Sequence, residues 1–508
     1  MAVLNINDYR DQVLGCWLGK NIGGTLGAPF EWWRQVNNVS FYTQELGGEP
    51  LPNDDLDIQL LWLLALEERG IKLDAHTLAE YWCLYVTPHW AEYGTGKINM
   101  RAGLPPPLSG TLFNDYRHSC GAFIRAEIWA CIAPGLPAVA AAYAREDAIL
   151  DHGNGEGTWG EVFIAALESA AFVVKDLRRV IDIGLSYIPA DSGVAQAART
   201  AMECFDAGRT WQEARDEVLR RHRGASHANR PNRTSPEDHR KGLADGALGY
   251  DVPSNIGITV LGLLYGGEDF SKMICITVNC GEDTDCTAAT AGSIYGILHG
   301  ARAIPEKWIK PIGRSIKTIC LNLGELNMGK RLPQTVDELT ERTERAARQV
   351  LLHRGKVSLS DAPSDLTGLS PEALMSPDGG RAMAESLAGP RYVFDFFTVE
   401  LDYGPAPLLR DGGTAPLRVT IRNTDKVQAN LTLRWYLPQG WRVTPGAEGF
   451  AMSLPAYMGP PLTLDYQISC ERMGRALGRA VLEITQEGRP TAMLVPVTFL
   501  NGNLMAGR

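Results

Sequence analysis

The period of the hydrophobic pattern changes near residue 355. Before that point, apolar residues recur every three or four positions, which places them on one face of an α-helix. Residues 8–20 show this spacing at Val13, Leu14, Trp17 and Leu18, and the stretches 121–131, 160–174 and 336–352 repeat it. The chain before residue 355 is therefore predicted to be helical.

Beyond a polar stretch, the period becomes two. Residues 356–390 are rich in Ser, Pro, Gly and Asp with weak periodicity, which predicts a linker. After it, Leu417, Val419 and Ile421 alternate with polar residues, as in a half-buried β-strand. Further strands are predicted at residues 431–437, 481–484 and 493–500, with Gly- and Pro-containing turns between them.

These two patterns predict a multidomain α plus β protein. We expect an all-α helical domain at residues 1–355, a linker at 356–390 and a β domain at 391–508. About 115 residues of short strands are typical of an antiparallel β-sandwich of immunoglobulin-like size. For this sandwich we expect one of three roles: assembly into a homo-oligomer, contact with carbohydrate, or cover for an apolar edge of the helical domain.

Composition narrows the classes of partner. The 508 residues are 45% hydrophobic and 21% charged, which is typical of soluble globular domains. The net charge of −10 argues against a general nucleic-acid binder, because phosphate contacts need a basic face. A small phosphorylated ligand remains compatible, since a few arginines and helix N-termini can hold it. With neither a membrane-length apolar stretch nor a signal-peptide pattern, we expect no membrane association.

The cysteines point to a reducing compartment. All ten are scattered singly and no CxxC occurs, so neither a zinc framework nor a thioredoxin motif is supported. Reduced, mostly buried thiols are typical of cytoplasmic proteins. We therefore expect a cytoplasmic location.

Two acidic clusters lie more than two hundred residues apart, Asn53-Asp54-Asp55 and Gly281-Glu282-Asp283-Thr284-Asp285. Each leads into an apolar helical stretch, and carboxylates at a helix start are favoured by the dipole and the free N–H groups. Helix capping is the alternative interpretation of each cluster. Together, however, they would repel one another unless cations neutralised them, and their hard oxygens suit Mg²⁺ or Ca²⁺ better than zinc or copper.

Three further features are candidates for function. Glu31 lies between Pro29-Phe30 and Trp32-Trp33, an apolar setting that would raise its pKa as a general acid or base requires, with a solvated loop glutamate as the alternative. His152 is interpreted either as a base or as a structural histidine. The basic stretch 220–241 is predicted to be an exposed loop, with a lid over an anionic ligand as the alternative.

Taken in order, the motifs resemble those of the ADP-ribosylglycohydrolases, over about residues 8–350. This family consists of all-helical, dinuclear-magnesium enzymes that remove ADP-ribose from proteins or small molecules. Its glycine-rich helix end leading to a glutamate is similar to residues 19–31, which end at Glu31. Its Thr-Asp-Asp-Thr motif resembles Asn53-Asp54-Asp55-Leu56, and its Asp-x-Asp-Thr motif resembles Asp283-Thr284-Asp285-Cys286.

The resemblance implies a set of site residues. Two Mg²⁺ ions, with Mn²⁺ as the alternative, would be held by Asn53, Asp54, Asp55, Asp283 and Asp285. The implied catalytic residues are Glu31, Asp54, Asp55 and Asp283. The segments that line the family's ribose and diphosphate pocket resemble Ser119-Cys120-Gly121-Ala122 and His152-Gly153-Asn154-Gly155, and Asn255 also fits. Backbone N–H groups of the two glycine-containing segments would hold the diphosphate.

Several positions depart from the family pattern. The threonines that flank the acidic pairs are replaced by Asn53, Leu56 and Cys286. Leu56 cannot ligate a metal, and the soft thiol of Cys286 is poorly suited to Mg²⁺. Thr287 offers a hydroxyl, although helix geometry points it elsewhere, and the family's Gly-Asp pair is Gly23-Gly24. A third carboxylate, Asp57, follows the first pair.

The resemblance therefore implies a metal-dependent hydrolase that cleaves a C1 N- or O-glycosidic bond of an ADP-ribosyl conjugate, through an oxocarbenium-like transition state. The expected partner is a small-molecule or ADP-ribosylated substrate, and neither nucleic acid nor membrane. Two alternatives stay open. One is a related glycoside or nucleoside hydrolase, and the other is a non-catalytic protein that binds ADP-ribose or a sugar.

Overall fold

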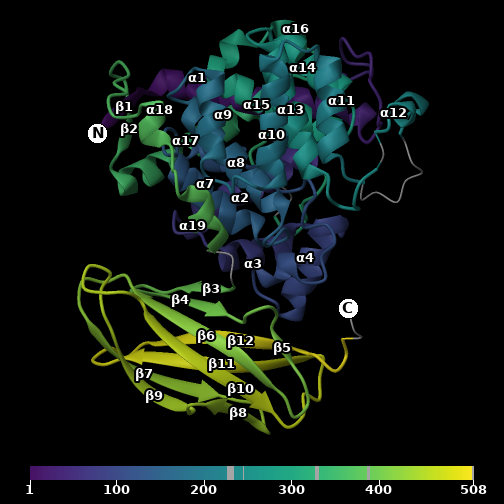
Figure 1. Ribbon diagram of the computed structural model, residues 1–508. Helices are drawn as coiled ribbons and strands as arrows, with labels where there is room; N and C mark the ends of the chain where they lie inside the picture. Colours follow the sequence, from purple (N-terminus) through teal and green to yellow (C-terminus); the bar gives the residue numbers. More distant parts are fainter. Residues whose placement is uncertain (226–233, 244, 327–330, 386–388, 506–508) are drawn as a thin grey trace. The chain divides into compact units, whose positions relative to one another are not determined.

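The structure is a computed structural model that describes residues 1–225, 234–243, 245–326, 331–385 and 389–505. Backbone contacts divide the chain into two units, one of residues 1–100 with 109–384 and the other of residues 101–108 with 385–508. The first unit is built from helices, together with one short pair of strands, and the second contains two sheets (Figure 1). The protein is thus an α plus β protein, as the sequence predicts.

The helices that position the candidate site come from separate stretches of the chain. They are α1 (Ile6–Gly27), α2 (Asp54–Arg69), α4 (Ala91–Ala102), α6 (Glu127–Cys131), α8 (Glu156–Ala171), α13 (Val252–Gly266), α14 (Phe270–Asn279) and α15 (Thr284–His299). The surrounding helices are α3 (Ala75–Tyr85), α5 (Leu108–Thr111), α7 (Pro137–Ala148), α9 (Leu177–Leu185), α10 (Gly193–Asp206), α11 (Trp211–His222), α12 (Pro236–Arg240), α16 (Glu306–Ile309), α17 (Val336–Arg354), α18 (Pro371–Leu374) and α19 (Gly379–Glu385). Single 3₁₀ turns are η1 (Ala28–Phe30), η2 (Phe123–Arg125) and η3 (Ala301–Ala303).

Helices α1 and α15 pack with their backbones in direct contact. Four glycines at every fourth position of α1 face α15: Gly15, Gly19, Gly23 and Gly27. A Cβ at these glycines would lie only 2.0–2.6 Å from backbone oxygens of α15. Because no side chain fits between the two main chains, glycine is required along this contact. The contact fixes the C-terminal end of α1 against the N-terminal end of α15.

Most of the predicted helices are confirmed, and two segments are corrected. Residues 8–20 and 336–352 fall in α1 and α17, and the stretch 160–174 lies in α8 as far as Ala171, where the helix ends. The stretch 121–131 is not one helix, because η2 forms first and α6 begins only at Glu127. From the sequence alone, the apolar run 274–278 is predicted to be strand-like, but it lies inside α14. A short apolar run fits a buried helix as well as a strand, so its pattern could not decide between them.

Segment 356–390, predicted to be a linker, carries three short elements. Strand β2 (Val357–Ser360) pairs in parallel with β1 (Ala2–Asn5), with Val357 opposite Ala2. Helix α18 and most of α19 belong to the helical unit. The two ends of the family-like region are therefore joined by a two-stranded sheet.

The predicted basic loop 220–241 is only partly exposed, and residues 226–233 within it lie outside the described residues. Helix α11 continues to His222, and α12 occupies Pro236–Arg240. Between them, the side chain of Arg223 is buried, at 1% exposure. The expectation of a solvated loop is wrong for this arginine, because it pairs with the buried carboxylates of Asp238 and Glu282.

The second unit contains two five-stranded sheets, ordered β3-β4-β6-β10-β8 and β5-β12-β11-β7-β9. The strands are β3 (Arg391–Val393), β4 (Phe397–Asp402), β5 (Leu408–Leu409), β6 (Thr414–Asn423), β7 (Ala429–Tyr436), β8 (Trp441–Thr444), β9 (Glu448–Ser453), β10 (Leu462–Cys470), β11 (Leu477–Gln486) and β12 (Ala492–Asn501). Neighbouring strands are antiparallel except β5 and β12, which are parallel.

The strands expected from period-two alternation coincide with β6, β7, β11 and β12. Along β6, buried and exposed residues alternate through Leu417, Val419 and Ile421. Aromatic rings join the two sheets, since Trp435 of β7 lies 5.1 Å from Tyr466 of β10 between ring centroids. The inward-facing residues of both sheets thus share one core.

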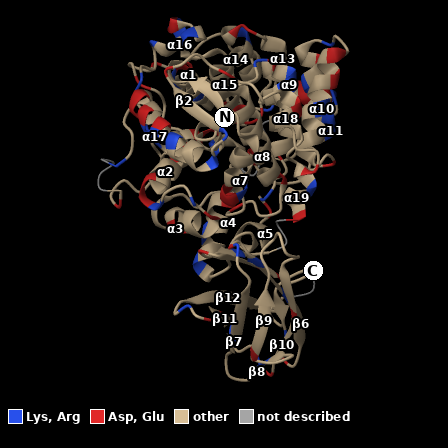
Figure 2. Cartoon of the chain, turned by 90° about the vertical axis from the view of Figure 1, so that its left-hand side faces the viewer, with Lys and Arg blue, Asp and Glu red and all other residues tan. Residues whose placement is uncertain are grey.

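Charged residues of both signs are interspersed along the surface helices, as Figure 2 shows for α17. Its Arg342 and Arg348 pair with Glu67 and Glu344. Among the described residues, no helix has the length and apolar character that crossing a bilayer requires.

Candidate metal centre

A cavity of about 460 Å³ in the helical unit brings the predicted acidic residues together. Its volume is in the usual range for small-molecule sites. Its wall includes the carboxylates of Glu31, Asp54, Glu92, Asp283 and Asp285, the aromatic side chains of Trp32, Trp90 and Tyr93, and the thiols of Cys120 and Cys286. Both acidic clusters and the segment ending at Glu31 therefore meet at one place.

The first cluster begins with a helix cap that also reaches the second cluster. The side chain of Asn53 caps α2 by accepting a hydrogen bond from the Asp55 backbone N–H at 2.7 Å. Its Nδ2 donates to Oδ2 of Asp285 at 3.4 Å. A Cβ at Gly24 would lie 2.6 Å from this Nδ2, so the amide of Asn53 fills the space beside Gly24. Capping and contact between the clusters are both present.

The second cluster is held by a buried network behind it. Glu282 has a left-handed backbone, with φ of 68°, and its carboxylate is buried between Arg223 (Nε 2.9 Å) and Arg34 (Nε 3.2 Å). Its carbonyl oxygen accepts from the Trp32 backbone N–H at 2.7 Å. Glu282 therefore anchors the turn before α15 rather than lining the cavity.

Asn255, a predicted substrate-binding residue, supports the same turn. Its Oδ1 accepts from the Asp283 backbone N–H at 3.2 Å, and its Nδ2 donates to the carbonyl of Asp251 and the sulfur of Cys120. It does not line the cavity among the described residues. Asn255 thus fixes the position of Asp283, the residue directly before α15.

Two groups of side chains have the spacing of metal ligands. Asp55, Asp285 and Cys286 form one group, and Glu31, Asp283 and Asp285 form the other; within each group the ligand atoms lie within 4.8 Å of one another. Asp285 belongs to both. All of these side chains are buried except Glu31, which is half-buried.

Several of these buried oxygens have no hydrogen-bond donor among the described residues. They are both carboxylate oxygens of Asp55, Oδ1 of Asp283 and Oδ1 of Asp285. A buried carboxylate without a partner costs several kcal/mol, unless it is protonated or bound to a cation. The oxygens of Asp283 and Asp285 belong to cavity-lining residues, and Asp55 lies next to Asp285 and Cys286 without lining the cavity itself. Hard oxygens gathered in this way fit a divalent ion.

The electrostatics favour a cation in the same way. Burial raises the pKa of Asp55 to about 7, where Lys20 opposes the shift and Asp54 adds to it. Burial also raises the pKa of Asp285 to about 7, with repulsion from Asp55 and Asp54. The pKa of Asp283 is raised by burial and by the charges of Asp285 and Glu31. A bound cation would stabilise all of these groups in the ionised form.

The remaining polar residues of the two motifs have structural contacts. Oδ2 of Asp57 accepts from the backbone N–H groups of Ile319 (2.7 Å) and Cys320 (2.5 Å). The added carboxylate therefore holds a loop of the cavity wall. The hydroxyl of Thr287 donates to the carbonyl of Asp283 at 2.9 Å, so it points away from the carboxylates, as helix geometry predicted.

The predicted diphosphate segments lie mostly outside the cavity wall. Gly121 lines it, whereas Ser119, His152, Gly153, Asn154 and Gly155 are absent from its lining among the described residues. His152 is fully buried, with Nδ1 2.8 Å from Asp151 and Nε2 3.4 Å from the Ser119 hydroxyl. Asp151 pairs with Arg125 at 2.7 Å. These residues form an enclosed network.

The sequence interpretation missed some of the cavity wall. Trp90, Glu92 and Tyr93 lie at the start of α4, and the Tyr93 hydroxyl is 3.3 Å from Asp54. A Trp-x-Glu-Tyr run at a helix start was the available signal. Lys20 was also missed, although a lysine inside a glycine-rich apolar helix is unusual. It is buried and pairs with Glu127 at 2.6 Å.

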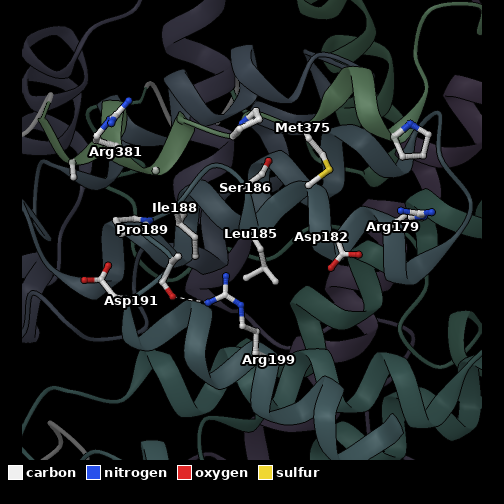
Figure 3. A pocket seen from close by; sticks show the side chains of 15 residues that line it. Arg179, Asp182, Leu185, Ser186, Ile188, Pro189, Asp191, Arg199, Met375 and Arg381 are labelled. Carbon is white, nitrogen blue, oxygen red and sulfur yellow. Dashed lines mark hydrogen bonds between the residues drawn. The ribbon is translucent and has the colours of Figure 1, made fainter.

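A second hollow, of about 690 Å³, is lined by α9, α10 and the segment 371–384. Figure 3 shows Arg179, Arg199 and Arg381 around it, together with Asp182 and Asp191. Arg199 donates to the carbonyl of Ala190 at 2.5 Å. None of the predicted site residues is among those that line this hollow.

Solved structures show little similarity to the chain. A FixG-related protein from Vibrio parahaemolyticus is 12% identical over 22% of this chain and 99% of its own, with a TM-score of 0.18. A conjugative transposon lipoprotein from Bacteroides eggerthii is 15% identical over 21% and 100%, with a TM-score of 0.16. The Pseudomonas fluorescens alkylpurine DNA glycosylase AlkC is 12% identical over 88% and 99%, with a TM-score of 0.11. Similarities this low carry no functional argument.

No curated protein matches the chain. The model of the ADP-ribosylglycohydrolase family, in contrast, matches residues 5–349. This range includes both acidic clusters, Glu31 and the whole cavity wall. The chain belongs to the ADP-ribosylglycohydrolase family.

Proposed function

We propose that the protein is a metal-dependent glycohydrolase that cleaves a C1 N- or O-glycosidic bond of an ADP-ribosyl conjugate. Family membership supports a glycohydrolase-type function. The observation that carries the proposal is the meeting of Glu31, Asp283 and Asp285 on one cavity wall, with Asp55 next to Asp285. Asp55, Asp283 and Asp285 all have buried oxygens without a hydrogen-bond partner among the described residues.

In this proposal, Asp55, Asp283 and Asp285 hold divalent ions, with Glu31 at the edge of the set. When bound, such ions would polarise substrate hydroxyls and lower the pKa of a water. The amide of Asn53, which contacts both Asp55 and Asp285, would keep the two clusters in register. Mg²⁺ is the expected ion for the oxygen ligands, with Mn²⁺ as the alternative.

Glu31 is proposed to move the proton. It is half-buried on the cavity wall, following the short η1 turn. From there its carboxylate would take a proton from the attacking water or give one to the leaving group. Substrate binding would use the aromatic wall, because the faces of Trp32, Trp90 and Tyr93 suit a sugar or a base.

A second candidate is a related hydrolase acting on a nucleoside or another glycoside. It is favoured by the enclosed position of His152 and Ser119, which leaves only Cys120 and Gly121 of the predicted diphosphate segments on the cavity wall. Such an enzyme would need the ribose and metal contacts without a diphosphate pocket.

Turnover assays separate these candidates. The purified protein would be incubated with Mg²⁺ or Mn²⁺ and with ADP-ribosylated peptides, O-acetyl-ADP-ribose, nucleosides and aryl glycosides, and the products identified by mass spectrometry. Release of ADP-ribose, abolished by chelation, is the expected result. Turnover of nucleosides or glycosides alone would replace the first candidate with the second. Tight binding of ADP-ribose or a sugar, with no product from any substrate, would instead indicate a binding protein.

The cellular setting is part of the same proposal. All ten cysteines are free thiols, which supports a cytoplasmic location. The acidic net charge supports a small-molecule or ADP-ribosylated protein substrate rather than nucleic acid. Gel filtration with light scattering would test whether the chain forms a homo-oligomer.

A further inference from the structure

The two ligand groups of the cavity differ in chemistry. Glu31, Asp283 and Asp285 offer only carboxylate oxygens, whereas Asp55, Asp285 and Cys286 combine two carboxylates with a thiol. The groups share Asp285 and are otherwise separate. The two groups therefore differ in the kind of ligand atom that they offer, oxygen alone in one and oxygen with sulfur in the other.

Cys286 is placed where a ligand would be. It lies in the first turn of α15, one residue after Asp285, and lines the cavity. Its sulfur lies within 4.8 Å of carboxylate oxygens of Asp55 and Asp285. Asp55 is buried, at 1% exposure, and neither of its carboxylate oxygens has a hydrogen-bond partner among the described residues. These oxygens are an independent sign that a cation belongs at this group.

We propose that the two groups select different cations, an inference that rests on the proposed metal-dependent function. Asp55, Asp285 and Cys286 take a borderline cation of the Zn²⁺ class, and Glu31, Asp283 and Asp285 take a hard cation such as Mg²⁺. Asp285, which belongs to both groups, would be shared between them. On binding, the Cys286 thiol releases its proton to solvent as the metal–sulfur bond forms, with no change of oxidation state.

The proposed cation preferences follow from the softness of the ligand atoms and from the number of protein ligands in each group. Thiolate sulfur favours Zn²⁺ over Mg²⁺, while carboxylate-only groups favour Mg²⁺ and Mn²⁺. Three protein ligands, of which Asp285 and Cys286 line the cavity, match the number in catalytic zinc sites, which keep a fourth position for water or substrate. Two cations beside Asp55, Asp283, Asp285 and Glu31 would also balance the acidic charge better than one.

A buried cysteine is often only a small apolar side chain. Two observations distinguish Cys286 from that case: its place on the cavity wall, and the unpartnered carboxylate that it faces. Cys275, which is half-buried on α14 and absent from the cavity wall, provides the matched comparison.

Cobalt titration provides the test, because Co²⁺ reports thiolate ligation by a sulfur-to-metal charge-transfer absorption. The full-length protein, stripped of metal, would be titrated with Co²⁺ in the presence of Mg²⁺, and Zn²⁺ and Mg²⁺ affinities would be measured by calorimetry. Wild type and Cys275→Ser should show the absorption. Cys286→Thr should lose it, and its preference for Zn²⁺ over Mg²⁺ should fall by ~100-fold, the upper range for loss of a contact that supports a metal ligand.

The outcomes distinguish this inference from the proposed function. A cobalt complex of wild type without the absorption, or one that keeps it in Cys286→Thr, would overturn the thiolate ligand. If Cys286→Thr loses the absorption and takes up Mg²⁺ at both groups, the thiolate accounts for the selectivity. Hydrolysis of the glycosidic bond is assayed separately, on the wild-type protein with Mg²⁺. If the wild-type protein lacks the sulfur-to-cobalt absorption but hydrolyses the substrate, the proposed difference in cation preference is overturned and the proposed function stands. Wild type that binds no cation at all would overturn both.

Discussion

The helical unit buries some of its ion pairs, whereas the described ion pairs of the β unit lie at the surface. In the β unit, ion pairs such as Arg418–Asp465 join adjacent strands at the surface, with side chains 55% and 68% exposed. In the helical unit, Arg223 and Glu282 form a pair that is 1% and 0% exposed, and Lys20 pairs with a buried Glu127. Exposed pairs contribute little to stability, whereas burying a charge is costly unless every partner is present. In addition to its surface ion pairs, the helical unit therefore buries some charges, and Glu282 is the residue directly before Asp283 of the cavity wall.

The most severe break in this arrangement is removal of the shared carboxylate. Asp285→Asn should lower kcat/KM by more than ~100-fold, since even loss of a contact behind a metal ligand costs that much. Metal content measured by mass spectrometry should fall with it. The matched control is Asp465→Asn in the β unit, which should retain both metal and activity. Full metal occupancy in Asp285→Asn would contradict the assignment of both ligand groups.

Glu31 separates proton transfer from metal binding. Glu31→Gln keeps the size and one oxygen of the side chain, so we expect the metal to remain while kcat falls by ~10²–10⁴-fold. The pH profile of kcat should lose one limb. Unchanged kcat would show that another group transfers the proton.

The buried pair Arg223–Glu282 can be compared with the exposed pair Arg418–Asp465 through the free energy of unfolding. Arg223→Ala leaves Glu282 buried without one of its cations, and should lower the free energy of unfolding by ~3–5 kcal/mol. The equivalent change at the surface, Arg418→Ala, should cost ~0–1 kcal/mol. Both are measured by urea denaturation. Equal effects would mean that burial does not distinguish the two pairs.

The close contact between α1 and α15 should not tolerate a single methyl group added at one of its glycines. Gly19→Ala places a Cβ about 2.0 Å from the carbonyl oxygen of Gly292 and should destabilise the protein by ~1–3 kcal/mol through overpacking. Gly449→Ala in the β unit, where a Cβ meets nothing within 4 Å, is the control. A stable Gly19→Ala variant with unchanged metal affinity would show that the helices can separate without moving the site.

The smallest expected effect is on the pH dependence of stability. In the metal-free protein the pKa values of Asp55 and Asp285 are about 7, above their usual unfolded value of ~3.9. The folded state therefore binds more protons, and its stability is fully present below pH ~4 and declines as pH rises through about 7. We expect a Tm shift of a few degrees over this range, from calorimetry, and its reversal by Mg²⁺. A metal-free Tm that rises between pH 5 and 8 would contradict these pKa directions.

The sequence predicted the periodic elements from their local pattern, and the family order of its motifs predicted that the two acidic clusters meet. Long helices such as 336–352 and strands such as that at Leu417 have repeats that one element can satisfy. Asp54, Asp55, Asp283 and Asp285 could be paired because their motifs occur in the family order. The roles of Asp57 and Glu282 could not be read in this way. Each is satisfied by partners far away in the chain, the backbone at Ile319 and the guanidinium of Arg223.

The cavity wall shows the same limit. Trp90 and Tyr93 reach it from α4, and no pattern within that helix tells which face meets the carboxylates. His152 was placed in a substrate pocket on its motif, whereas its surroundings bury it against Asp151 and Ser119. Whether these residues affect substrate binding stays a prediction for mutagenesis.

The backbone contact between α1 and α15 has a consequence for how this enzyme class can diversify. Glu31 follows one end of the contact and Asp285 begins the other, so the distance between them is set by main-chain atoms instead of by rotamers. Substitutions of the aromatic wall at Trp90 or Tyr93 act on a different helix. We therefore expect substitutions of the aromatic wall to change substrate preference while the proposed metal ligands keep their spacing. Substitutions of the glycines, in contrast, should move the proposed ligands relative to one another.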